Sequence, residues 1–242
     1  MQTDKRNSWV GERFGEIEED VLGNIEDVKD MTWPQLVEEY SIRGRRIVLR
    51  MIENIESEAE RIAEIYRNGI DEMVENGEYE WHHDPQAIIE RVQSGEWNFY
   101  GAYLDGMLVE VLSFHIVRGQ RTMHWIWGCV DPAYRGLGII KNLSKYYDKV
   151  TELSGAQLGI AWMVTSHSHS QKAVEAAGYK PIGCFVGSEF FGGSDGRYYR
   201  ANVIWYGKVY GDASKHVQRW ESMKLTPNAQ RLVTVVRELW EE

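Results

Sequence analysis

The chain has 242 residues, 43% hydrophobic and 26% charged, which fits one soluble globular domain with extensions better than two full-sized domains. Its formal net charge is −10, which argues against a nucleic-acid surface because phosphate binding needs a basic face. No apolar stretch is long enough for a signal peptide or a membrane span, and the two cysteines lack metal-ligand spacing, so we expect a cytoplasmic protein without a membrane partner.

The N-terminal part is acidic and weakly patterned. We expect residues 1–43 to form an extension with one short helix that begins at Thr32 and Pro34, since both residue types favour helix starts. Apolar spacing and flanking turn residues then predict, in order, a strand (45–52), an amphipathic helix (56–77) and a shorter helix (84–95).

Residues 97–130 have the pattern of three antiparallel strands joined by two turns. The first turn is Asp105-Gly106, a dipeptide that tolerates the positive φ angles of a two-residue hairpin loop. The second is the polar segment 118–121, which leads into a strand that ends at Val130. We therefore expect a three-stranded meander in the middle of the chain.

Helices and strands alternate after residue 130. The predicted elements are a helix (137–153), a strand (157–166), a helix (170–178), two strands (179–187 and 198–211) with a glycine-rich turn, and a helical tail (212–242). This order predicts an α/β (α+β) fold in which helices cover a mixed sheet. It places the main domain at 44–211, between the extension and the tail.

The passage from the meander into the next helix is the segment Arg135-Gly136-Leu137-Gly138. The first N–H groups of a helix have no partner within it, and glycines leave the main chain open to a ligand. The helix end adds partial positive charge and Arg135 a formal one, which favours a phosphate site. Glycines at such a corner can also simply make the turn, and neither a P-loop nor a dinucleotide fingerprint is present.

Two motifs resemble those of the GNAT superfamily of N-acetyltransferases. VDPAYRGLGI (130–139) resembles its acetyl-CoA signature, SQKAVEAAGYKPIG (170–183) resembles its second motif, and the element order from 44 to 210 matches. The resemblance implies a mostly antiparallel sheet that splits between the fourth and fifth predicted strands, with acetyl-CoA or another acyl-CoA in the split and no metal. Its pyrophosphate would rest on the amides of residues 135–140. The residues implied in cofactor binding are Cys129, Val130, Arg135, Gly136, Leu137, Gly138, Ile139 and Ile140.

Three positions depart from the family pattern. Ile140 stands where the family has a small residue, and His167 replaces an expected Asn. Val174 stands where a Tyr commonly protonates the departing thiolate. These departures keep a second reading open, namely a catalytically weak, CoA-binding regulatory module.

Amine acylation needs a group that takes a proton from the amine. His124 lies six residues before Val130, where protein-acetylating members of the family often have a Glu, and a neutral imidazole suits deprotonation near pH 7. A structural role beside the tryptophans of the same strand is the alternative. Glu110, a carboxylate within an apolar strand, could bind a substrate ammonium or act through water, or it could simply face outward.

Further candidates lie toward the C-terminus. His167, Ser168 and His169 follow the fifth predicted strand and could form a polar rim where acyl group and substrate meet, although Ser and His are also common at a helix start. His-x-His lacks a third metal ligand at convincing spacing. Tyr199 could donate the proton that Val174 cannot.

We therefore expect an acyl-CoA-dependent N-acyltransferase that moves acetyl to a primary amine of a small cationic molecule, by direct attack in a ternary complex. The charge balance favours that small-molecule substrate. Alternatives are the regulatory module and acyl transfer to a nucleobase, nucleotide or protein amine. A homodimer is left open.

Overall fold

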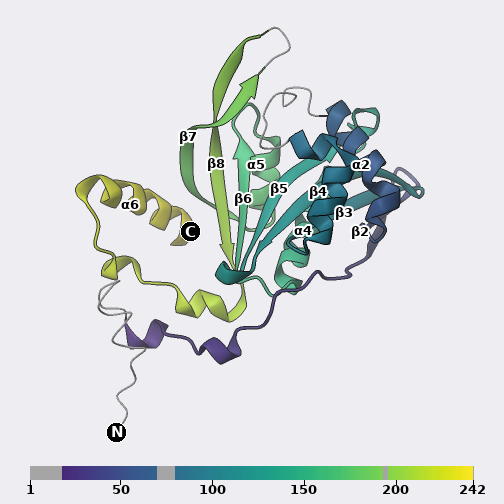
Figure 1. The fold of residues 1–242 in the computed structure, drawn as a ribbon. Coiled ribbons are helices and arrows are strands. Elements are labelled where there is room, and N and C mark those ends of the chain that lie inside the picture. Colours follow the sequence, from purple (N-terminus) through teal and green to yellow (C-terminus); the bar gives the residue numbers. More distant parts are fainter. Residues whose placement is uncertain (1–17, 70–79, 193–195, 242) are drawn as a thin grey trace.

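A computed structural model describes residues 18–69, 80–192 and 196–241. It contains an eight-stranded sheet in the order β1-β2-β3-β4-β5-β6-β8-β7, with β5 and β6 parallel and the other neighbours antiparallel (Figure 1). The strands are β1 (Glu38–Ile42), β2 (Arg45–Met51), β3 (Trp97–Leu104), β4 (Met107–Val117), β5 (Thr122–Val130), β6 (Leu158–Val164), β7 (Lys180–Gly192) and β8 (Tyr198–Val209). The expected mixed, mostly antiparallel sheet is confirmed.

Helices cover both faces of the sheet (Figure 1). They are α2 (Ile55–Gly69), α3 (Pro85–Gln93), α4 (Ile140–Leu153), α5 (His169–Ala176) and α6 (Pro227–Glu241). Because strand side chains alternate, Phe99 of β3 packs with α2 and α3, whereas its neighbour Tyr100 packs with α4. Two buried clusters result, one on each face, and we refer to the faces as the α2/α3 face and the α4/α5 face.

The N-terminal prediction was wrong at one element. Residues 38–42 form strand β1, not part of a helix, and they pair with β2 through a turn at Arg43 and Gly44. Both turn residues have positive φ angles, 50° and 79°, as a tight hairpin requires. The sheet therefore begins at Glu38, earlier than the predicted boundary at residue 44, and η1 (Glu19–Val21) and η2 (Ile25–Asp27) are only single 3₁₀ turns.

The other N-terminal predictions agree with the structure. β2 lies within 45–52, and α3 begins where the Asp84 side chain accepts a hydrogen bond from the Gln86 N–H at 2.9 Å. α2 is described as far as Gly69, so the remainder of the predicted helix lies outside the described residues. The meander is confirmed, and its first turn has Asp105 and Gly106 at φ 49° and 88°.

β5 and β6 separate along their length. They pair in parallel over four residues, Thr122–Trp125 with Leu158–Ala161, and no backbone pairing joins them beyond that point among the described residues. The segments Ile126–Val130 and Trp162–Val164 therefore border an opening in the sheet. This is the split that the resemblance implied between the fourth and fifth predicted strands.

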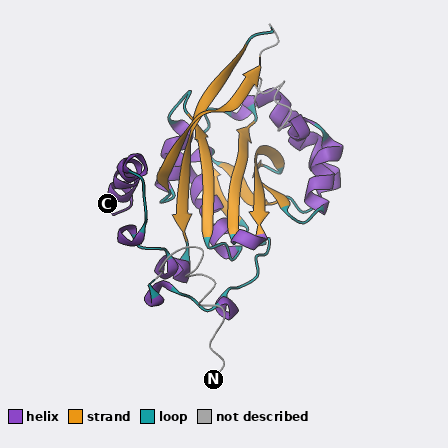
Figure 2. Ribbon diagram, turned by 60° about the vertical axis from the view of Figure 1, so that its left-hand side comes forward, coloured by secondary structure: helices purple, strands orange, loops and turns teal. Residues whose placement is uncertain are grey.

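The C-terminal part begins with a long hairpin. β7 and β8 project beyond the rest of the sheet, since only Val203–Val209 of β8 pairs with β6, and part of the predicted glycine-rich turn lies outside the described residues (Figure 1). The tail contains 3₁₀ segments, η7 (Gly211–His216) and η8 (Trp220–Ser222), before α6, which lies beside β7 (Figure 2). Among the described residues, no helix is long and apolar enough to cross a bilayer.

Candidate active site

The corner after β5 is shaped by Asp131. Its backbone N–H donates to the Val109 oxygen at 2.9 Å, and its side chain accepts from the Ala133 N–H at 2.9 Å, which starts η6 (Pro132–Tyr134). Arg61 of α2 forms an ion pair with the same carboxylate. These contacts turn the chain away from the sheet at the end of β5.

The next residues present a row of unpaired amides. From Gly136 to Ile140, no backbone N–H donates a hydrogen bond to another described residue, and α4 starts without a side-chain cap. Gly136 and Gly138 have φ angles of 73° and 87°, and a Cβ added at either would meet nothing within 4 Å. The corner is therefore an open cradle of N–H groups at a helix N-terminus, which suits an anion. We call residues 136–140 the amide cradle.

Two arginines lie beside the amide cradle. Arg135 is less available than its sequence position suggested, because its Nη2 donates to the Gly69 oxygen at 2.7 Å and its N–H to the Pro132 oxygen at 3.3 Å. The predicted row of free amides is thus shortened to 136–140. Arg43, which the sequence did not single out, extends from the β1–β2 turn and donates to the Gly136 oxygen at 3.3 Å.

His124 lies at the closed end of the split, since its strand partner on β6 is Ile160 and the pairing ends one residue later. Its ring lies between His115 of β4 and Trp162 of β6, at centroid distances of 6.0 and 5.7 Å. Its Nε2 is buried and has no hydrogen-bond partner among the described residues. Burial, with a smaller effect of His115, lowers the pKa of His124 to about 4, so the imidazole is neutral at pH 7.

Aromatic rings continue from His124 across the α2/α3 face. Trp97 stacks on His115 at 4.3 Å, and on the other side Trp162 stacks on Trp205 at 5.4 Å. The indole Nε1 of Trp162 is also buried without a hydrogen-bond partner among the described residues. Two polar atoms, one from each strand that borders the split, are thus left for a ligand.

Glu110 does not join His124. Its side chain lies under α4 on the opposite face, where it is only 3% exposed and accepts a hydrogen bond from the Tyr147 hydroxyl at 2.6 Å. Burial raises the pKa of Glu110 to about 8, so most of this carboxyl group is protonated at pH 7. The structure therefore gives no support to the prediction that Glu110 binds a substrate ammonium, because the carboxyl group is covered.

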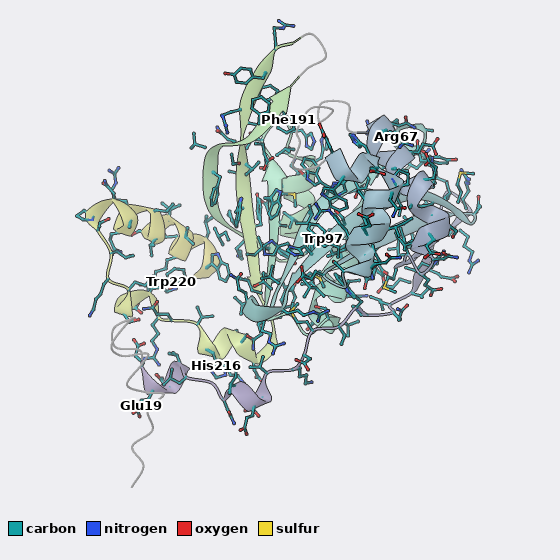
Figure 3. All side chains as sticks on the ribbon, viewed as in Figure 1. Glu19, Arg67, Trp97, Phe191, His216 and Trp220 are labelled. Atoms are coloured by element: carbon teal, nitrogen blue, oxygen red, sulfur yellow. The ribbon has the colours of Figure 1, made fainter. Side chains whose placement is uncertain are left out.

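The remaining candidates are dispersed. His167, Ser168 and His169 are exposed where β6 leads into α5, with the two imidazole rings 5.4 Å apart. Tyr199 lies in the projecting hairpin and stacks on Phe191 at 5.3 Å; Figure 3 shows Phe191 there, well away from Trp97. No hydrogen bond or ring contact joins Tyr199 to β5 or β6 among the described residues, so its role as proton donor has no structural support.

Cys129 borders the split, and its side chain is buried against α2. Its Sγ lies 3.4 Å from the Ile65 oxygen, and burial raises the pKa of the thiol to about 12. A Cβ at Gly69 would approach that sulfur to 2.2 Å, so the glycine allows α2 to pack closely on β5. The neutral thiol fits direct transfer better than a covalent enzyme intermediate.

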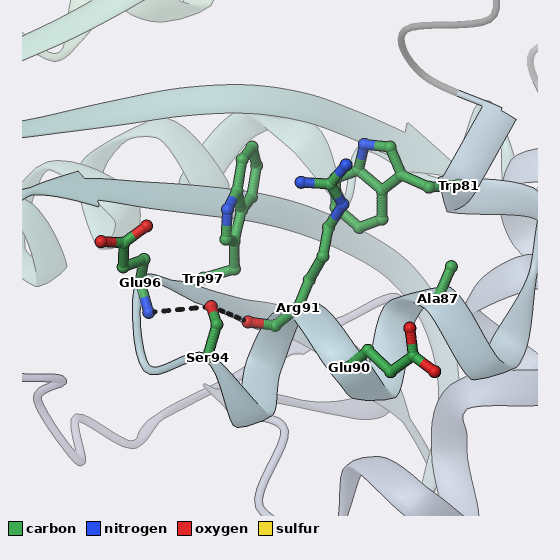
Figure 4. Close-up of a pocket in the computed structure, with 7 residues that line it drawn as sticks. All are labelled: Trp81, Ala87, Glu90, Arg91, Ser94, Glu96 and Trp97. Carbon is green, nitrogen blue, oxygen red and sulfur yellow. Dashed lines mark hydrogen bonds between the residues drawn. The ribbon is translucent and has the colours of Figure 1, made fainter.

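A surface pocket of about 400 Å³ opens beside α3. Figure 4 shows Arg91 between the indoles of Trp81 and Trp97, with the guanidinium carbon 4.3 and 5.2 Å from the ring centroids. Two of its lining residues reach His115, whose ring is next to that of His124: Trp97 stacks on it, and the Glu96 carboxylate lies 4.0 Å from its Nε2. The pocket contains neither the amide cradle nor His124 itself.

The sequence matches the model of the acetyltransferase (GNAT) family over residues 49–179, more than half of the chain. The chain belongs to this family. A GNAT enzyme uses acetyl-CoA, and the unpaired amides, open glycines and uncapped helix of this chain fit the pyrophosphate of such a co-substrate. The described residues contain no cluster of three or more side chains that could hold a metal ion.

Solved structures of acetyltransferases have the same fold. The ribosomal-protein-S5-alanine acetyltransferase from Vibrio fischeri is 14% identical, with a TM-score of 0.54 over 73% of this chain and 98% of its own. A ribosomal L7/L12 alpha-N-protein acetyltransferase in complex with coenzyme A is 17% identical, with a TM-score of 0.55 over 73% and 99%. A spermidine N-acetyltransferase from Vibrio cholerae is 12% identical, with a TM-score of 0.56 over 71% and 96%. No curated protein matches this GNAT chain significantly.

Proposed function

We propose that this protein transfers acetyl from acetyl-CoA to a primary amine of a small cationic molecule, by direct attack in a ternary complex. The proposal is supported by the positions of two features: the amide cradle lies at one end of the split, and the unpartnered His124 Nε2 lies at the other. The two sites lie at opposite ends of the same stretch of β5, which is the arrangement that a long thioester substrate requires.

The amide cradle would bind the pyrophosphate. Five successive N–H groups point to no described partner, and the helix end adds partial positive charge. Arg43 adds a formal positive charge at the edge of the cradle. The side chain of Ile140, which is half-exposed, stands where the family has a small residue, and it can lie along the ligand because it is not packed in the core.

His124 would receive the proton that the amine loses as it adds to the thioester carbonyl. An alkyl amine has a pKa of ~10.4, so its neutral form at pH 7 costs about 4–5 kcal/mol. An imidazole with a pKa of about 4 is too weak a base to deprotonate the free ammonium efficiently. It is better suited to the much more acidic N–H of the adduct, so the amine enters the reaction neutral.

The departing thiolate needs no dedicated acid. Val174, at the position where the resemblance places a Tyr, is buried and supplies no proton. A thiol has an ordinary pKa of ~8.5, so a thiolate is a tolerable leaving group near neutral pH. The missing Tyr therefore does not require a catalytically weak protein.

The acceptor would lie over the α2/α3 face. The rings of His124, Trp162 and Trp205 form the floor there, and an ammonium group is attracted to the face of a tryptophan. With Glu110 on the opposite face, ring faces rather than that carboxylate would bind the cationic part of the acceptor.

The proposal is tested by incubating the protein with acetyl-CoA and a panel of amines and measuring the products by mass spectrometry. We expect a mass gain of one acetyl group on small cationic amines, together with coenzyme A binding by calorimetry. Binding without any acetylated product would favour the regulatory module instead, and acetylated nucleotides or peptides alone would reassign the acceptor. No heat with coenzyme A would reject the proposal as a whole.

A further inference from the structure

β5 contains a bulge on the wall of the split. Leu112 pairs with Gly128 and Phe114 with Trp125, so Ile126 and Trp127 together face the single residue Ser113. A bulge of this kind re-aims the backbone of its strand. It begins directly after Trp125, the last residue of β5 that pairs with β6.

At the bulge, the Trp127 peptide is bound by side chains instead of by the backbone of the neighbouring strand β4. The Trp127 N–H donates to Ser113 Oγ at 3.2 Å, and the Tyr66 hydroxyl donates to the Trp127 oxygen at 2.7 Å. Ser113 Oγ in turn lies 3.0 Å from His82 Nε2. Tyr66, His82 and Ser113 are each no more than 2% exposed, so water does not compete for these bonds.

The hydroxyl of Ser113 is fully used. It has one hydrogen to donate and accepts the Trp127 N–H, so His82 Nε2 is its nearest remaining partner. The imidazole of His82 is itself fixed, because it stacks on Trp81 at 3.7 Å and packs against Tyr66 at 4.6 Å. Residues from α2, η4 (Glu80–His83) and β4 thus fix one peptide of β5.

A hydrogen-bond network that only stabilised the fold could lie anywhere in the core. The peptide that this network holds lies directly beyond the closed end of the split, three residues after His124 on β5, where the thioester would lie under the proposed function. The carbonyl oxygen becomes negative there as the amine adds, and it needs a backbone N–H already aimed at it. A misplacement of about 1 Å can cost on the order of 100-fold in rate.

We propose that Tyr66, Ser113 and His82 are positioning residues that hold the Trp127 peptide, so that the N–H of the next residue, Gly128, faces the acyl carbonyl oxygen. This inference rests on the proposed function. These residues act through Trp127 and do not touch the substrate. Substituting these residues should therefore reduce the polarisation of the carbonyl and kcat. It should leave coenzyme A binding unchanged, because that binding depends on the amide cradle.

The test uses Ser113→Ala and Tyr66→Phe, which remove one hydroxyl each. The matched control is Thr122→Val, which also removes a buried hydroxyl from this sheet but at the far end of β5, where Thr122 donates to the Gln120 oxygen at 3.1 Å. We measure Tm, the Kd of coenzyme A, kcat, and the infrared frequency of the ¹³C-labelled carbonyl in bound acetyl-CoA. The last measurement needs no acceptor amine.

In both variants we expect kcat to fall by about tenfold or more and the carbonyl frequency to move toward its value in water, with the Kd of coenzyme A within about twofold of the parent value. The double variant should lose less than the product of the single losses, since both bonds hold one peptide. Thr122→Val should lower Tm comparably and leave kcat and the carbonyl frequency unchanged.

An unshifted carbonyl in both variants would overturn the inference, as would losses that track Tm equally in all three proteins. A parent protein that binds no acetyl-CoA gives no carbonyl signal and fails the proposed function instead. A parent protein that binds acetyl-CoA with an unpolarised carbonyl fails this inference alone.

Discussion

Glu110 and His124 are both buried and titratable, but burial has opposite consequences for them. It raises the pKa of Glu110 to about 8 and lowers that of His124 to about 4, because burial disfavours the charged form of each group. Both are therefore largely neutral at pH 7. Glu110 is then bound to Tyr147 inside the core, whereas the Nε2 of His124 has no hydrogen-bond partner among the described residues.

The stability of the protein should depend on pH through Glu110. Its pKa is about 8 when folded and 4.5 in the reference state, so between these values the folded protein holds a proton that the unfolded chain has released. The resulting stabilisation is complete below about pH 4.5 and is lost as the pH rises to about 8. Glu110→Gln should abolish this slope and raise Tm at pH 8. The free energy of unfolding, measured with denaturant at several pH values from 5 to 9, tests this expectation.

The control for this experiment is Glu56→Gln, which removes an exposed carboxylate of α2. Its pH dependence should follow that of the parent protein. A Glu110→Gln variant that retains the parent slope would show that Glu110 is ionised in the fold.

His124→Gln should lower kcat by about 10- to 100-fold, because glutamine fills a similar space but cannot accept the proton. The control is His115→Gln, which changes the neighbouring imidazole on the same face and should leave kcat within about twofold. For an alkyl amine, kcat/KM should rise with pH toward the pKa of the acceptor, with no histidine ionisation between about pH 5 and 8. An acid limb near pH 6.5 that disappears in His124→Gln would contradict the low pKa.

At the scale of elements, the corner between β5 and α4 depends on two glycines. Gly138 has a φ angle of 87° in open space, so an alanine there meets backbone strain of about 1–2 kcal/mol but no clash. Its methyl group would also occupy the approach to the amide cradle. We expect Gly138→Ala to weaken coenzyme A binding by about tenfold or more, measured by calorimetry.

Gly106→Ala separates strain from ligand binding. Gly106 lies in the β3–β4 turn with a φ angle of 88° and also has nothing within 4 Å of an added Cβ. Both variants should lose similar stability, but only Gly138→Ala should lose affinity. Equal affinities for coenzyme A in the two variants would reject the amide cradle as the pyrophosphate site.

Most elements could be predicted from local sequence, and the exceptions have a clear cause. The Asp84 cap, the Asp105-Gly106 turn and the glycine corner each depend on residues within a few positions. The helix expected after Thr32 failed because Arg43 and Gly44 form a tight turn that pairs β1 with β2, and this pairing overrides a local helix start. The predicted helix at 137 begins at Ile140 because Gly138 has a positive φ angle.

The candidate site was less predictable because its contacts are distant in sequence. Arg43 lies 93 residues from Gly136, and Tyr66 lies 61 from Trp127. No local pattern indicates such pairs. The placement of Glu110 failed for a related reason: alternation in β4 does not tell which face α4 will cover. His124 could be proposed because the resemblance fixed its distance from Val130.

At the scale of the whole molecule, the sheet consists of two parts joined weakly. The part β1–β5 meets the part β6–β8 through the four residue pairs from Thr122–Leu158 to Trp125–Ala161. Beyond them, Ile126–Val130 and Trp162–Val164 lack partners across the split among the described residues. A ligand between these segments would bridge the two parts and satisfy backbone groups on both.

Amide hydrogen exchange can measure this bridging. Addition of coenzyme A should slow exchange in 126–130, 136–140 and 162–164 together, because the ligand orders both walls of the split as well as the amide cradle. α6, which packs on β7 at the other edge of the sheet, should show no change. Protection confined to 136–140 would mean that the ligand binds the corner without entering the split, and His124 would then lie too far away to act on it. Gly138→Ala, at a concentration of coenzyme A that saturates the parent protein, should reduce all three protections in parallel.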